Sequence, residues 1–85
     1  MPKNQVLNLV EQLQQEIDQD ENLTADKKEK LEALIKNIEC GLDEEKVSEE
    51  LSDSLSETIT DFETSYPRLT SIINDIMVTL SNLGI

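Results

Sequence analysis

Apolar residues recur at helical spacing in two successive segments of the first half of the chain. The first stripe predicts a helix over residues 4–19, because its members fall on one helical face. The second stripe predicts a helix over residues 25–40, with Thr24 as its N-cap and Gly41 as its left-handed stop. The stripes comprise Val6, Leu9, Val10, Leu13 and Ile17, and then Leu31, Leu34, Ile35 and Ile38.

A narrower apolar stripe follows and predicts a third helix over residues 44–64. It steps by four residues through Val47, Leu51, Leu55 and Ile59 and then reaches Phe62. Asp43 is suited to cap this helix, and Leu42 stands at the spacing of a hydrophobic staple with Val47. The remaining positions are mostly Glu, Asp, Ser and Thr, so we expect this helix to depend on tertiary packing.

Pro67 separates the third helix from a fourth, predicted over residues 67–82. Proline disfavours helical backbone at the residue before it and suits the first position of a new helix, with Ser65 or Tyr66 as the cap. The fourth helix has the widest apolar face in the chain, formed by Leu69, Ile72, Ile73, Ile76, Met77, Leu80 and Leu83. We expect the surplus of this face to be buried against the first two helices or against another chain.

Together these patterns predict an all-α fold, a small antiparallel bundle of four helices arranged as two helical hairpins. The 85 residues suffice for one helical domain covering residues 1–85, with an aliphatic core. We expect the chain to form a homo-oligomer, a dimer, through the surplus apolar face of its fourth helix. The interface residues of this dimer are Leu69, Ile72, Ile73, Ile76, Met77 and Leu80.

The net charge of −12 narrows the class of partner. Phosphate backbones and anionic lipid surfaces would be repelled, so we expect neither nucleic acid nor membrane as a partner. A basic protein would be attracted instead. The acidic residues of the third helix would present this charge on one face: Glu45, Glu49, Asp53 and Glu57, with Glu50 and Asp61 beside them.

Cysteine usage and hydropathy favour a cytoplasmic protein. Cys40 is the single cysteine, so no disulfide can form within the chain, which suits a reducing compartment. The first twenty residues carry no signal-peptide pattern, and no apolar run is long enough to cross a membrane.

The residues that most catalytic chemistry needs are missing. There is no His, the two Gly stand apart, and the single Cys has no His partner, so we predict neither an enzyme nor a cofactor. One calcium hypothesis remains open, because five oxygen donors fall at the offsets of an EF-hand loop. They are Asp18, Asp20, Asn22, Asp26 and Glu29, but Leu23 stands where that loop needs Gly.

Residues 62–69 read Phe-Glu-Thr-Ser-Tyr-Pro-Arg-Leu, and the chain ends Leu-Gly-Ile. This pattern resembles a family of short bacterial proteins, domain of unknown function 4404, whose members typically read Phe-Glu-x-Ser-His-Pro-x-Leu and finish in Gly-Ile. The positions that carry the resemblance are Phe62, Glu63, Ser65, Tyr66, Pro67, Leu69, Gly84 and Ile85. Because Tyr66 replaces the usual His, an acid–base or metal role does not carry over, whereas a capping or packing role is compatible with Tyr. The resemblance implies a small helical cytoplasmic protein of bacteria and supplies no activity.

Three functional hypotheses follow from the sequence. The first is a non-enzymatic, acidic protein–protein interaction module that self-associates through its fourth helix. The second is a binder of a basic protein partner through the acidic face of the third helix. The third is a calcium-binding protein that uses the EF-hand-like stretch 18–29.

Overall fold

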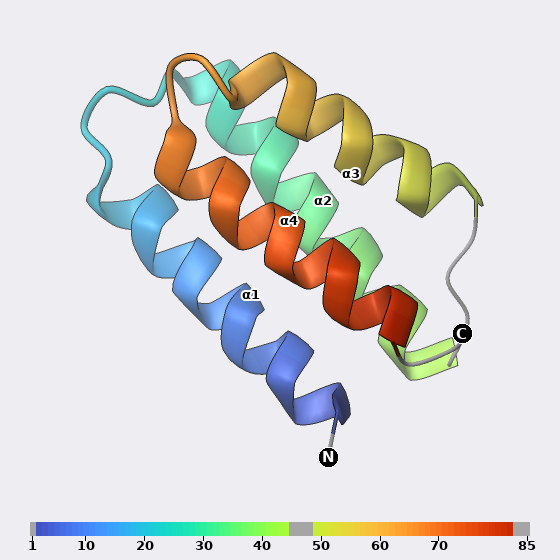
Figure 1. Cartoon of the computed structure of the whole chain (residues 1–85). Coiled ribbons are helices and arrows are strands. Elements are labelled where there is room, and N and C mark those ends of the chain that lie inside the picture. The colour runs from blue at the N-terminus through green and yellow to red at the C-terminus, as the bar shows by residue number, and fades with distance from the viewer. Residues whose placement is uncertain (1, 45–48, 83–85) are drawn as a thin grey trace.

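The computed structural model describes residues 2–44 and 49–82 and confirms the predicted all-α bundle. Its four helices are α1 (Pro2–Gln19), α2 (Ala25–Glu44), α3 (Glu49–Phe62) and α4 (Pro67–Asn82). Successive helices run in opposite directions, so α1 with α2 and α3 with α4 form two helical hairpins (Figure 1). Within the described residues, none of the four helices combines the length and the apolar character that a membrane span needs.

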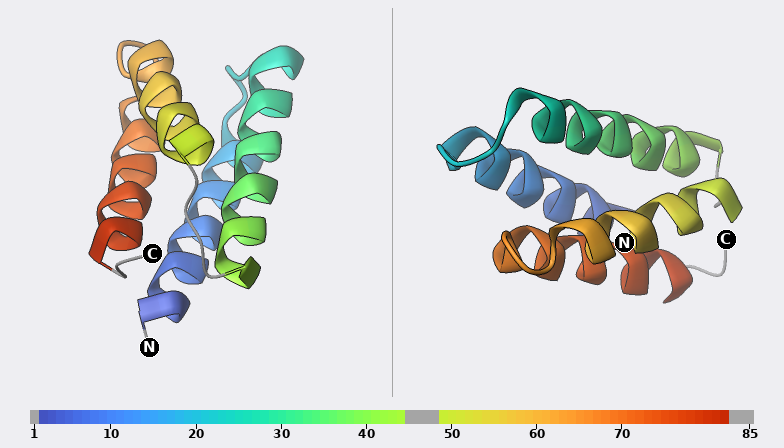
Figure 2. Two further views of the ribbon diagram at one scale, coloured as in Figure 1. Left: turned by 90° about the vertical axis from the view of Figure 1, so that its right-hand side faces the viewer. Right: turned by 90° about the horizontal axis from the view of Figure 1, so that it is seen from above.

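The two hairpins pack side by side around one aliphatic core. Among the described residues, each helix contacts two neighbours, and α1 packs most extensively against α4. Figure 2 shows the hairpin α3–α4 beside the hairpin α1–α2, with α4 lying next to α1. The core consists of Val6, Val10, Leu13, Ile17, Leu31, Leu34, Ile35, Ile38, Leu42, Leu51, Leu55, Phe62, Leu69, Ile73, Ile76 and Leu80.

The start of α2 and the start of α4 follow the capping rules that the sequence suggested. The Thr24 carbonyl accepts the first helical bond from the Lys28 N–H at 2.9 Å, and the Thr24 hydroxyl accepts from the Lys27 N–H at 3.3 Å. Thr24 is therefore the N-cap of α2. At α4, the Tyr66 carbonyl accepts from the Thr70 N–H at 3.1 Å, so Tyr66 rather than Ser65 is the residue that caps this helix.

The predicted boundary between the second and third helices is wrong. Gly41 lies inside α2, which continues to Glu44, and it is buried rather than placed at a left-handed stop. The reason is Leu42, which extends the stripe of Ile38 by one turn and is only 2% exposed. Burying a Leu contributes about 2 kcal/mol, which exceeds the cost of about 1 kcal/mol for Gly in a helix interior.

The proposed cap and staple of the third helix fail for the same reason. Asp43 and Leu42 belong to α2, so neither starts α3. The structure describes α3 from Glu49 to Phe62 rather than over 44–64, and Val47 lies outside the described residues. In contrast, α4 has the predicted bounds, and α1 begins at Pro2, two residues before the predicted start, because proline fits a first helical turn.

Candidate functional site

The family-like stretch forms a corner at one end of the bundle, where α3 turns into α4. Phe62 is buried, and its ring centroid lies 5.5 Å from that of the half-buried Tyr66 at an interplanar angle of 45°. The Lys27 ammonium from α2 lies 5.0 Å from the Tyr66 ring centroid and 5.7 Å from the Phe62 ring centroid. Both distances allow cation–π attraction, so this Lys joins the second hairpin to the first.

A hydrogen bond ties the same corner to the connection between α1 and α2. The Tyr66 hydroxyl donates to the Asn22 carbonyl oxygen at 3.0 Å. This connection is itself ordered by the Asn22 N–H, which donates to the Asp20 carboxylate at 2.9 Å. The Tyr66 side chain therefore has a structural role at the corner, consistent with the capping and packing role that the sequence allowed.

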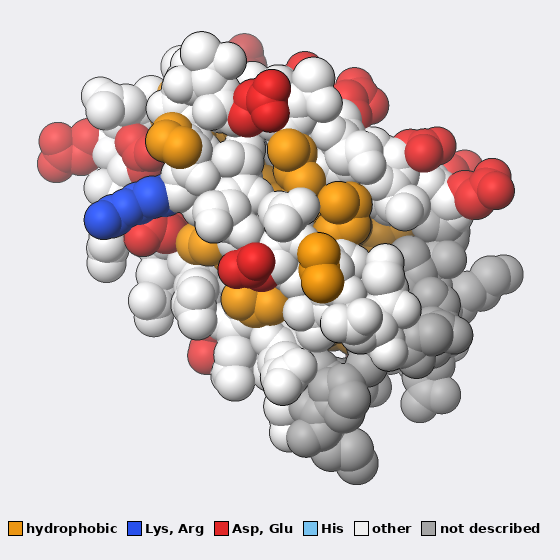
Figure 3. All heavy atoms as spheres, in the orientation of Figure 1, with side chains coloured by type: hydrophobic (Ala, Val, Ile, Leu, Met, Phe, Trp, Pro, Cys, Tyr) orange, Lys and Arg blue, Asp and Glu red, His pale blue; other side chains and the backbone are white. Residues whose placement is uncertain are grey.

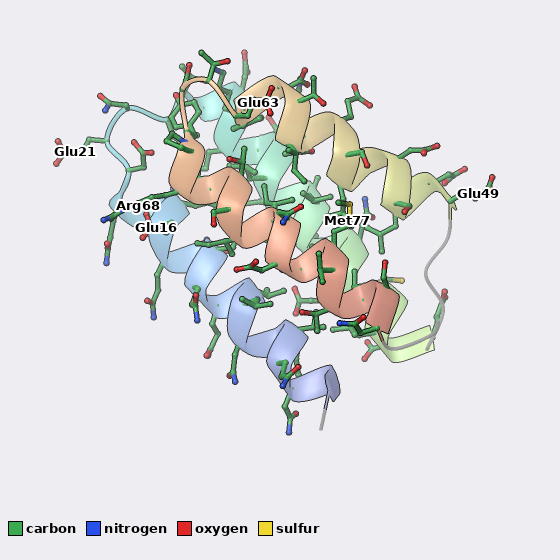
Figure 4. All side chains as sticks on the ribbon, in the orientation of Figure 1. Glu16, Glu21, Glu49, Glu63, Arg68 and Met77 are labelled. Carbon is green, nitrogen blue, oxygen red and sulfur yellow. The ribbon has the colours of Figure 1, made fainter. Side chains whose placement is uncertain are left out.

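Arg68 adds a weak ionic contact between α4 and α1 at this end. Its guanidinium lies 3.9 Å from the Glu16 carboxylate, and the Arg68 side chain is 86% exposed (Figure 4). Exposed pairs at this distance contribute little to stability. Of the other motif positions, Leu69 is buried, whereas Glu63, Ser65 and Pro67 are exposed; Gly84 and Ile85 lie outside the described residues.

The acidic face of α3 carries five exposed carboxylates among the described residues. It consists of the exposed side chains of Glu49, Glu50, Asp53, Glu57 and Asp61. None of them forms an ion pair with a Lys or Arg in the part of the chain that the structure describes. Glu45, the sixth residue that the sequence assigned to this face, lies outside that part.

The spacing within the acidic face of α3 is repulsive. Glu49, Asp53, Glu57 and Asp61 follow one another at intervals of four residues, so neighbouring carboxylates lie on one side of the helix. Like charges at this spacing destabilise a helix by about 0.2–0.5 kcal/mol per pair. Asp61 also lies in the last turn, where the negative end of the helix dipole opposes its charge. A cationic ligand would relieve this repulsion.

A groove between α2 and α3 adjoins this face and was not predicted from the sequence. One hollow of about 290 Å³ lies toward the end of α2, and a second of about 230 Å³ lies toward Phe62. Both are lined by Asn37 and Ser54, where they meet. The helical periodicity of an apolar stripe identifies the buried side of its helix, but it does not reveal how far apart two packed helices lie.

The residues of the calcium hypothesis are not gathered into a metal site. Thr24 caps α2, so Asp26 and Glu29 lie within that helix, and Asp18 lies within α1. Only residues 20–24 connect the two helices, too few for a twelve-residue calcium loop. Within residues 2–44 and 49–82, no group of three or more His, Cys, Asp or Glu side chains is placed to hold a metal ion.

Most of the residues predicted for a self-association interface contribute to the core of the chain itself. Leu69, Ile73, Ile76 and Leu80 are at most 3% exposed, and Ile72 and Met77 are partly buried against the core. Helix α1 packs against α4, so much of this apolar face is buried within the chain, and Leu83 lies outside the described residues. Among the described residues of α4, Val78 is the large apolar side chain that is most exposed, with an exposed fraction of 49%.

The face formed by α1 and α4 has a shallow groove whose lining carries little charge. Figure 3 views this face and shows scattered apolar side chains over α4 and α1, with acidic side chains along the edge formed by α3 and charged side chains at the end near the α1–α2 connection. A groove of about 380 Å³ between α1 and α4 includes Leu9, Val78 and a single carboxylate, that of Asp75. This face therefore differs in character from the acidic face of α3.

Comparison with known proteins identifies a family but no relative of known activity. A family model described as a domain of unknown function, DUF4404, matches residues 6–85, a range that includes the corner motif and all four helices except the start of α1. No curated protein and no solved structure matches the chain.

Proposed function

The chain belongs to the DUF4404 family, a domain of unknown function, and from that premise we propose that it is a protein-interaction module that binds a basic partner through the acidic face of α3. The role is non-enzymatic: the protein binds and does not transform its partner. The observation that carries this proposal is the series of carboxylates at intervals of four residues, exposed and without an ion pair among the described residues.

The electrostatic argument has two parts. Repulsion within the acidic face of α3 costs folding free energy, and a partner that brings Lys or Arg to this face recovers it. The overall charge of −12 also attracts basic proteins over long distances and speeds their encounter with the chain. Both effects weaken with added salt, because ions screen exposed charges beyond about 8–10 Å at physiological strength.

Calorimetric titration with a Lys-rich peptide at about 50 mM and 500 mM salt tests this proposal. We expect binding at low salt that a triple variant, Glu50→Gln, Asp53→Asn and Glu57→Gln, weakens strongly. The matched control neutralises three exposed carboxylates of the first hairpin, through Glu11→Gln, Asp18→Asn and Glu21→Gln. Equal weakening by both triple variants would show that net charge alone matters and would overturn the assignment to α3.

Self-association is a second candidate, supported by a different observation. Val78 on α4 is 49% exposed and lies in the same groove as the partly buried Leu9 of α1. A second copy of the chain would meet this weakly charged face with less repulsion than any approach through α3. Sedimentation equilibrium tests it: we expect a dimer that Val78→Glu dissociates, and a monomer at high micromolar concentration would refute it.

The protein's proposed location is the bacterial cytoplasm. Cys40 is a free and exposed thiol. A reducing compartment keeps such a thiol from forming intermolecular disulfides.

A further inference from the structure

The groove between α2 and α3 has a floor of mixed polar and apolar character and an acidic rim. Buried Leu34, Leu51 and Phe62 contribute to its floor, and the small residues Ala33 and Gly41 leave space above α2. Its charged lining consists of Glu44, Glu50, Glu57, Asp61 and Lys30. The groove lining thus holds four carboxylates and one ammonium group. Three of the four carboxylates, those of Glu50, Glu57 and Asp61, belong to the acidic face of α3.

We infer that this groove binds a basic amphipathic helix of a partner protein, with the apolar side of that helix on the groove floor and its Lys or Arg side chains at the rim. The inference rests on the proposed function and specifies the shape of the partner. Charge complementarity selects a basic segment, and the apolar side chains of the floor select one with an apolar side.

The walls of the groove select a helix over an extended peptide. Both walls are helices, whose interior backbone N–H and C=O groups are bonded within the helix, so away from the helix ends they offer no edge to an added strand. The Thr58 hydroxyl, which lines the groove, already donates to the Ser54 carbonyl at 2.7 Å and so does not donate to a peptide backbone. A helix satisfies its own backbone and needs only side-chain contacts.

The distribution of charge along the groove sets the arrangement of the partner. From Lys30 to Glu44 the α2 wall spans about 21 Å at 1.5 Å per residue, which matches a helix of about 14 residues. Lys30 lies at the end near Asp61 and Phe62, whereas Glu44 and Glu50 line the other end without a described cation. The partner's basic side chains therefore concentrate at the end lined by Glu44 and Glu50.

Two fluorescent peptides of about 14 residues test this inference against the intact protein. The first carries Lys on one helical face and Leu and Ala on the other. The second has the same residues with two central proline substitutions, which prevent a helix. We expect the helical peptide to bind at least about tenfold more tightly at low salt in fluorescence anisotropy.

Groove-filling substitutions locate the binding. Ala33→Trp fills the hollow near Phe62 from an exposed position of α2, and Ser71→Trp adds the same side chain to an exposed position of α4 outside the groove. We expect Ala33→Trp to weaken binding at least about tenfold and Ser71→Trp to change it less than about twofold. Circular dichroism of each variant checks that it is folded.

Cys40 supplies a second readout that needs no substitution. It is exposed, lines the hollow near Glu44, and is the single cysteine of the chain. We expect bound helical peptide to slow alkylation of this thiol by N-ethylmaleimide several-fold, whereas the proline peptide at equal concentration leaves the rate unchanged.

The outcomes separate this inference from the proposed function. Equal affinity for both peptides, wild-type binding by Ala33→Trp, or unprotected Cys40 would each overturn the helix-in-groove inference and leave the acidic-face proposal standing. Failure of wild-type protein to bind either peptide at low salt would overturn both.

Discussion

Replacing Gly41 with Ala is the sharpest test of how α2 ends. If Gly41 were a left-handed stop, Ala would be forced to positive φ and would destabilise the chain. Gly41 instead lies within α2, three residues before its last residue, Glu44. A helix-interior Gly costs about 0.5–1 kcal/mol relative to Ala, so the substitution should raise the free energy of unfolding by that amount.

The surroundings of Gly41 have space for the added methyl group. Gly41 is buried, and yet it lines the hollow of about 290 Å³ between α2 and α3. The methyl group therefore enters the edge of the groove rather than a filled core, and the overpacking penalty of a dense interior does not apply. We expect the helix-propensity gain to dominate.

Thermal unfolding followed by circular dichroism measures the effect. For a domain of this size, about 0.5–1 kcal/mol corresponds to an increase in Tm of roughly 2–8 °C. Ala33→Gly is the matched control, because Ala33 lies two turns earlier on the same side of α2, and it should lower Tm by a similar amount. A lower Tm for Gly41→Ala would refute the helical assignment of Gly41 and restore the left-handed stop.

Three further substitutions test the core and the corner by chemical denaturation. Ile76→Asp should unfold the chain, because Ile76 is 0% exposed and an unpaired buried charge costs several kcal/mol; a wild-type transition midpoint would contradict this. Tyr66→Phe should lower stability by about 0.5–1.5 kcal/mol through loss of the bond to Asn22, and an unchanged midpoint would exclude a net contribution. Thr24→Ala should cost about 1 kcal/mol as a lost N-cap, whereas no loss would argue against that cap.

The sequence predicted the features of this fold that depend on local pattern. The bounds of α4 could be predicted because Pro67 favours a helix start and the apolar stripe after it is long. The end of α2 could not, since Gly41 carries a strong local stop signal that the burial of Leu42 overrides. That burial depends on packing between helices, which the chain order alone does not reveal.

The candidate site was predictable in its charge and unpredictable in its contacts. The acidic face of α3 follows directly from residue spacing, and five of its six predicted residues lie in the described structure. Lys27 was not expected to contact Phe62 and Tyr66, because nothing local relates residues so far apart in the chain. The groove was missed for the same reason, although the small residues Ala33 and Gly41 were visible as its one sequence signal.

Two regions of the molecule therefore have separate proposed roles. The corner of Phe62, Tyr66 and Pro67 joins the two hairpins at one end (Figure 1), and its contacts concern folding. In the acidic face of α3, carboxylates at intervals of four residues repel one another, whereas Glu49 and Glu50 in the first turn are favoured by the helix dipole; the proposed role of this face is binding. Variants of the corner should alter stability, and variants of the acidic face should alter affinity.

The location at which a basic helix binds tests the proposed function most directly. In a titration of the ¹⁵N-labelled protein with the helical peptide, we predict that amide chemical shifts change most along the α2–α3 groove, at Asn37, Gly41 and Ser54. Shifts centred on the groove of Leu9 and Val78 between α1 and α4, or spread evenly over all acidic surfaces, would contradict it.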